Sequence, residues 1–170
     1  IASSDEITPA ERTVFRAIGK ANLATRVPIF THTANGLEAE AQLDIFESLG
    51  VPSAHVVIGH LGGLDDPAAT VHKAIAARGA FVGFDRVTGG RVDDAQKVET
   101  IMAFLEAGHG DKLLVSSDFT GRRSEARPGY GNSITVFAPL LREAGIDADV
   151  LRAIQRDNPR RFLAFVPRTV

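Results

Sequence analysis

The chain has no cysteine among its 170 residues. This absence excludes a disulfide framework and any metal site built on thiolates, so a bound metal would need imidazole and carboxylate ligands. Such ligands favour a hydrolytic metal site over a structural zinc site. A lack of cysteine also fits a cytoplasmic enzyme, which is the location we expect, although secreted proteins can lack cysteine too.

Long apolar runs and concentrated charge are also missing. No run approaches the roughly 18–20 residues that a membrane-spanning helix needs, and the formal net charge is -2 with scattered Lys and Arg. We therefore expect no membrane span and no nucleic-acid partner. No targeting signal can be read in residues 1–4, which carry no charged side chain. A hydrophobic content of 44% is typical of a globular protein with a sizeable core.

Short apolar runs alternate with amphipathic helical patterns along the whole chain. The apolar runs, which we expect to be buried strands, end at His32, His60, Asp85 and Asp118. Residues 1–4 are interpreted as the end of a further strand. Alternation at about 25–35 residues per unit is typical of βα units with a parallel sheet. No linker rich in Pro, Gly or Ser interrupts the pattern, so residues 1–170 are expected to belong to one domain.

Helix starts carry recognisable capping residues. Thr8 and Glu11 form a capping box with Pro9 at the first helical position. The segment Asp65-Asp66-Pro67 predicts the start of another helix that ends near Gly79. The remaining expected helices cover residues 37–49, 94–107, 133–143 and 148–156, and a last turn begins at Asn158.

The number of βα units limits the possible folds. We count four and a half units, whereas a closed (β/α)8 barrel typically needs about 250 residues. The chain therefore fits half of such a barrel. The rival is a complete flavodoxin-like sheet of about five strands, but no glycine-rich phosphate loop follows the first strand.

Three of the strand-end residues could hold a metal. Parallel strands place their carboxyl ends on one rim, which would bring His32, His60 and Asp118 together. A single histidine at a strand end is more often a structural group, but three metal-binding residue types at the same position favour ligation. Asp118 would otherwise be a partly buried and unpaired carboxylate.

The same residues carry a resemblance. Thr31-His32-Thr33, Ile58-Gly59-His60, Gly83-Phe84-Asp85-Arg86 and Ser116-Ser117-Asp118, in this order and with the closing segment 157–163, resemble the second half of the phosphotriesterase family of the amidohydrolase superfamily. The resemblance implies a binuclear-metal (β/α)8 TIM barrel. This chain would be its C-terminal half, from the end of strand 4 to the terminal helix.

The resemblance also implies roles. His32 and His60 would hold one of two divalent metal ions, and Asp118 would hold the other and move protons while a bridging hydroxide attacks. Zinc is the first expectation for both ions, with cobalt, manganese and iron as alternatives. A His-x-His pair and a carboxylated lysine that bridges the metals would lie upstream of Ile1. We therefore expect a fragment that begins just after this lysine, and a homodimer as the assembled form.

The pair Asp85-Arg86 bears on the substrate. By resemblance, specialised phosphotriesterases carry histidine after this aspartate, whereas the lactonase-like branch carries arginine. A fixed guanidinium at the rim could pair with Asp85 or Asp118 and orient the substrate. The alternative is a purely structural salt bridge at the mouth of the barrel.

The longest loop, residues 119–132, follows Asp118 and is expected to cover the site. Phe119 and Tyr130 are predicted to line the pocket, although ordinary loop packing explains them equally well. Arg122, Arg123 and Arg127 could attract an acidic substrate, but a solvated charge cluster is the more common explanation. His55, His72 and His109 are assigned no role in the chemistry.

We therefore expect a metal-dependent hydrolase that acts on a small molecule. The first expectation is a lactonase that opens acyl-homoserine or aliphatic lactones. The alternative within the same site is phosphotriester hydrolysis. A different class, a metal-free barrel that serves as a binding protein, also remains open.

Overall fold

The computed structural model describes residues 1–119 and 129–167, and within them a parallel sheet of four strands lies in the order β1-β2-β3-β4. The strands are β1 (Ile29–Phe30), β2 (Val56–Ile58), β3 (Phe81–Phe84) and β4 (Leu113–Val115). Neighbours in sequence are neighbours in space, and each pair is parallel. A flavodoxin-like sheet would reverse its strand order near the first strand, so this alternative is excluded. The sequential order is that of an arc of a (β/α)8 barrel.

The first residues of the chain continue this arc. Ala2 forms an isolated parallel bridge with His32. The His32 N–H donates to the Ile1 carbonyl over 2.8 Å, and the Ser3 N–H donates to the His32 carbonyl over 3.1 Å. The expected strand end at residues 1–4 is thus present beside β1, and it fixes the backbone of His32 from the side opposite β2.

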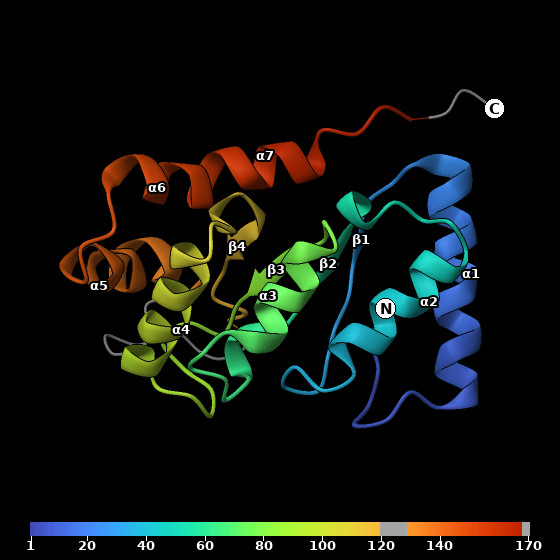
Figure 1. Ribbon diagram of the computed structural model, residues 1–170, viewed down its shortest axis with the longest axis horizontal. Coiled ribbons are helices and arrows are strands. Elements are labelled where there is room, and N and C mark those ends of the chain that lie inside the picture. The colour runs from blue at the N-terminus through green and yellow to red at the C-terminus, as the bar shows by residue number, and fades with distance from the viewer. Residues whose placement is uncertain (120–128, 168–170) are drawn as a thin grey trace.

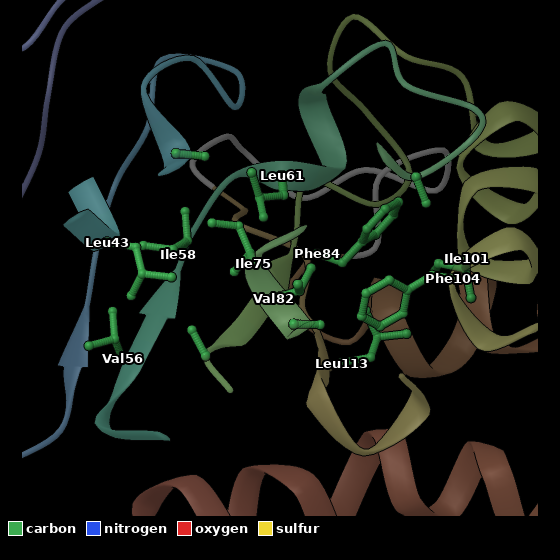
Figure 2. Close-up of a cluster of buried hydrophobic side chains, with 14 of the residues drawn as sticks. Leu43, Val56, Ile58, Leu61, Ile75, Val82, Phe84, Ile101, Phe104 and Leu113 are labelled. Carbon is green, nitrogen blue, oxygen red and sulfur yellow. The ribbon is translucent and has the colours of Figure 1, made fainter. Parts of the chain in front are cut away.

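Helices cover the sheet in chain order (Figure 1). They are α1 (Pro9–Thr25), α2 (Ala39–Ser48), α3 (Thr70–Ala77), α4 (Asp94–Glu106), α5 (Ala138–Glu143), α6 (Ala148–Arg152) and α7 (Asn158–Leu163). The main core lies between them and the strands; Figure 2 shows Leu43, Ile58, Ile75, Val82 and Phe104 converging there. Burial of each such side chain contributes about 1.5–3 kcal/mol to folding. None of the described helices combines the length and apolar content that crossing a bilayer requires.

The other face of the sheet carries a smaller apolar cluster. Val57 and Phe81 are buried there against Phe162 of α7, and the Phe81 and Phe162 rings lie 5.4 Å apart. The Asn158 side chain, at the start of α7, donates to carbonyls of Gly110 and Leu113 at the amino end of β4. Helix α7 therefore closes the end of the sheet opposite to the strand-end histidines and aspartates.

Two glycines allow the strands to approach closely at their carboxyl ends. A Cβ on Gly59 would lie 2.2 Å from the Thr31 carbonyl oxygen, and one on Gly83 would lie 2.9 Å from the Gly59 Cα. Any larger residue would push the strands apart. These glycines therefore help to set the distance between the side chains that follow β1, β2 and β3.

Several helix boundaries differ from the sequence prediction. Helix α3 begins at Thr70 rather than near Pro67, because the Ala69 N–H closes a turn onto the Asp66 carbonyl and Ala69 adopts a left-handed backbone with φ of 54°. The Asp66 carboxylate still caps the helix by accepting the Val71 N–H over 2.9 Å. The helices expected from residues 133 and 148 exist, but each contains a π-helical turn, at Ser133–Phe137 and Ala153–Asp157.

The capping box at the start of α1 is confirmed. The Glu11 carboxylate accepts hydrogen bonds from the Thr8 N–H and hydroxyl, each over 2.8 Å, and the Glu11 N–H donates to the Thr8 hydroxyl. These bonds, first the backbone N–H of Thr8, then its hydroxyl and that of Ser4, lower the pKa of Glu11 from 4.5 to about 2.

We predict that Glu11→Gln lowers stability at pH 7 and that its effect disappears in acid. The folded state holds the charged form of Glu11, so its contribution is complete above the unfolded pKa of 4.5 and is lost as the pH falls toward 2. Urea unfolding midpoints measured between pH 2 and 7 check this. Glu6→Gln, an exposed change before the helix, serves as the control. A loss of stability in Glu11→Gln that stayed constant with pH would contradict the charged capping bond.

Candidate metal centre

His60 is held in place by the aspartate that follows the next strand. His60 comes two residues after β2, and Asp85 directly follows β3 with only 2% of its surface exposed. One Asp85 oxygen accepts the His60 backbone N–H over 3.0 Å, and the other lies 2.7 Å from His60 Nδ1. Because a carboxylate only accepts, Nδ1 carries the proton in the neutral ring. The Nε2 lone pair of His60 is then left for a metal.

Asp118 lies beside this pair and is held by Arg86. Its Oδ2 accepts the Arg86 Nε–H over 3.1 Å and lies 3.8 Å from His60 Nδ1. Arg86 also donates from Nη1 to the Asn35 side-chain oxygen over 2.9 Å. About a third of the Asp118 side chain is exposed, at 32%, so it can meet a bound molecule. Of the two pairings left open for Arg86, the structure has the one with Asp118.

His32 completes the group from β1. Its ring centroid is 4.3 Å from that of His60, and the two planes are nearly perpendicular at 85°. Partial burial, followed by the charges of His60 and Arg86, lowers the pKa of His32 below its ordinary value of 6.5. His32 is therefore neutral near pH 7, which is the form that binds metal.

The site residues have unusual backbone conformations. His60, Arg86 and Asp118 have φ values of 64°, 60° and 44°, in the left-handed region that residues other than glycine rarely adopt. Such conformations persist only where surrounding contacts hold them, and they cluster at functional sites. Here each directs a polar side chain from a strand end toward the shared rim.

The donors that meet at this rim fit a divalent metal. His60, Asp85 and Asp118 each offer one ligand atom, and these atoms all lie within 4.8 Å of one another. With the His32 ring alongside, the set contains imidazole and carboxylate only, which suits zinc, cobalt, manganese or iron. The group within 4.8 Å contains Asp85 rather than His32, and Asp85 is the residue that accepts the His60 Nδ1–H and so orients the ring. Which of these four residues ligate stays a prediction.

A cavity of about 350 Å³ opens beside Arg86 and Asp118. Its other lining residues are Val87, Thr88, Gly89, Gly90, Ser117, Phe119 and Asn132. Phe119 lines this cavity and is 9% exposed, while its place in a substrate pocket stays a prediction. Tyr130 is 79% exposed, and its ring meets Phe119 edge-on at 5.7 Å, so it packs on the outer side. The predicted roles of Arg122, Arg123 and Arg127 lie outside the described residues.

Two residues of the site were missed by sequence reasoning. Asn132 is buried and donates to the Thr88 hydroxyl, while its Oδ1 has no hydrogen-bond partner in the part of the chain that the structure describes. It directly precedes the π-helical turn Ser133–Phe137, and the sequence before it has no periodic pattern that could have pointed to it. Lys97 is buried in α4 behind the Arg86 loop. A lysine on the inward, apolar face of a predicted helix was the available signal.

The chain resembles known proteins along nearly its whole length. The phosphotriesterase family model matches residues 1–163. The chain is 32% identical to an aryldialkylphosphatase of Saccharolobus solfataricus, over 96% of the chain and 56% of that protein. It is 32% identical to the phosphotriesterase homology protein of Escherichia coli, over 94% and 56%. An N-acetyltaurine hydrolase of Homo sapiens is 24% identical over 97% of the chain and 51% of its own length.

Solved structures agree with the sequence matches. The Escherichia coli phosphotriesterase homology protein, complexed with phosphate in its active site, superimposes with a TM-score of 0.87 at 29% identity, over 95% of this chain and 57% of that one. A mutant of a Deinococcus radiodurans lactonase of phosphotriesterase-like type gives a TM-score of 0.85 at 30% identity, over 96% of this chain and 56% of that one. The chain thus spans just over half the length of these relatives, and the predicted half barrel is confirmed. It belongs to the phosphotriesterase family.

Proposed function

We propose that the protein to which this chain belongs is a binuclear metal-dependent hydrolase that opens lactones. The observation that carries this proposal is the meeting of His60, Asp85 and Asp118 within 4.8 Å at the carboxyl ends of three parallel strands, beside His32. His32 and His60 would hold one metal, and Asp118 would hold the other. The remaining ligands would come from the upstream part of the barrel.

Asp118 is suited to proton transfer. A bound divalent metal would lower the pKa of a water toward neutrality and polarise the substrate carbonyl. One Asp118 oxygen is held by Arg86, which fixes the carboxylate plane at the rim. Asp118 takes a proton from the attacking water as the new C–O bond forms, and returns it to the ring oxygen as the ester bond breaks. The product is a hydroxy acid, and the carboxylate is regenerated.

Arg86 and the adjoining cavity support a lactone as substrate. The resemblance to the lactonase-like branch rests on arginine at this position, and Arg86 lines the cavity while it holds Asp118. A guanidinium fixed by Asn35 and Asp118 offers its remaining N–H groups to a carbonyl oxygen at the rim. The lactonase from Deinococcus radiodurans, at 30% identity, supports the same choice.

Phosphotriester hydrolysis is the second candidate. The relative from Saccharolobus solfataricus is an aryldialkylphosphatase and is 32% identical. Both reactions concentrate negative charge on oxygen in the transition state, so the same donors could serve both. A small-molecule substrate, a homodimer and a cytoplasmic location remain our predictions for the whole protein.

We predict that lactones are the better substrates. In the full-length protein, kcat/KM for acyl-homoserine or aliphatic lactones should exceed that for a paraoxon-like triester by more than about tenfold, equivalent to about 1.4 kcal/mol in activation free energy. Arg86→His should shift this ratio toward the triester, because it removes the guanidinium. Steady-state kinetics with both substrates test this. A wild-type preference for the triester by orders of magnitude would show that Arg86 does not select for lactones.

We also predict that His60→Ala removes metal while the fold is kept. Loss of one imidazole ligand should reduce metal content from about two equivalents per protein toward one, and hydrolysis should fall with it. Mass spectrometric metal analysis and circular dichroism measure the two effects. His55→Ala, at the other end of the same strand, is the matched control and should keep both metals. Full activity in His60→Ala would refute the assignment, and a wild-type protein without metal would favour the binding-protein alternative.

A further inference from the structure

Lys97 is a charged side chain in an apolar setting. It lies on the inward face of α4, one and two turns before Ile101 and Phe104, and only 1% of it is exposed. A buried ammonium is stable only when its three N–H groups are satisfied. Lys97 Nζ has three acceptors: the Arg86 carbonyl at 2.8 Å, the Gly89 carbonyl, and Asp94 Oδ1 at 3.2 Å.

The acceptors of Lys97 belong to the loop that carries Arg86. Asp94, one turn before Lys97 on α4, also accepts the Thr88 N–H over 2.8 Å. Together the two α4 side chains bind three backbone groups between residues 86 and 89. Arg86 and Thr88 have left-handed φ values of 60° and 62° in this loop. Conformations of this kind require such outside support from neighbouring groups.

We propose that Lys97 is a positioning residue for the reaction, acting on Asp118 through the backbone of Arg86. The proposal rests on the hydrolase function proposed above. The Lys97 ammonium contacts the Arg86 carbonyl, and the Arg86 side chain in turn contacts Asp118 and Asn35. Lys97 holds the Arg86 carbonyl, which supports the left-handed backbone of Arg86 and hence the direction of its guanidinium. No described contact joins Lys97 to the metal-ligand candidates themselves, so its effect must pass through this loop.

Lys97→Met in the full-length protein tests the catalytic consequence. Groups that orient metal-site residues typically cost 10–100-fold when removed, so kcat should fall by roughly that factor with little change in KM. Arg86→Met should show a similar loss. In the double variant the two losses should not multiply, because both remove the same orientation of Asp118. Losses that multiply would overturn the proposal and leave Lys97 an ordinary structural residue.

Hydrogen exchange tests the structural consequence without any activity assay. In metal-free protein, amide exchange in residues 86–90 should be faster in Lys97→Met than in wild type. Thr100→Val is the matched control, because Thr100 is buried one turn further along α4 and bonds to Gln96 and Asp66 rather than to this loop. Equal exchange in Lys97→Met and wild type would overturn the proposal. If Lys97→Met does not fold, Asp94→Asn must speed the exchange of Thr88 instead, and failure to do so has the same meaning.

Chemical rescue separates the ammonium from the shape of the side chain. Because the chain has no cysteine, Lys97→Cys introduces the one thiol of residues 1–170. Alkylation of this thiol with 2-bromoethylamine in the unfolded protein, followed by refolding with metal, restores an amine of nearly the same length. Protection of residues 86–90 and kcat should both recover. Recovery of neither would refute the role of the ammonium. If wild type hydrolyses none of the substrates yet the exchange results hold, the proposed function fails while the loop assignment stands.

Discussion

The candidate site depends on the parallel, sequential pairing of the strands. Because β1 to β4 run in one direction without a reversal, the residues that follow each strand by one to three positions reach the same edge of the sheet. One rim is shared by four residues that lie up to 86 positions apart in sequence, namely His32, His60, Asp85 and Asp118. Gly59 and Gly83 bring the strands close enough for the side chains to touch. The direction and spacing of the strands therefore bring these four side chains together, and their individual contacts come second.

Electrostatic contacts at the rim form two connected pairs. Asp85 accepts hydrogen bonds from His60, and Arg86 donates one to Asp118. Asp85 thereby orients His60, and Arg86, which also bonds to Asn35, orients Asp118. The buried Asp85 would be costly if it stood alone, since an isolated carboxylate strongly disfavours burial. Its two bonds to His60 explain how it can be only 2% exposed.

Much of this arrangement could be predicted from sequence, for a simple physical reason. Buried parallel strands read as short apolar runs, and the polar residue that ends each run is placed by strand direction alone, which located His32, His60 and Asp118. The capping box of Thr8 and Glu11 is equally local and was found.

The start of α3 was missed because Ala69 turns left-handed, a conformation that its identity does not suggest. The partner of Arg86 stayed open, since its backbone φ of 60° decides where the side chain points. The helical spacing places Lys97 on the inward face of α4, but its acceptors, like the Thr88 partner of Asn132, are tertiary contacts that no spacing encodes.

The left-handed backbone at the rim also restricts how this protein could diversify. At Arg86 and Asp118, φ values of 60° and 44° disfavour β-branched side chains regardless of the chemistry they would bring. Glycine, asparagine and aspartate tolerate this region best. Many substitutions at these positions, in nature or in a laboratory library, will therefore destabilise the backbone whatever their effect on activity. New specificities should be sought more readily at the cavity positions with ordinary φ, such as Val87 and Phe119, than at the residues that hold the rim itself.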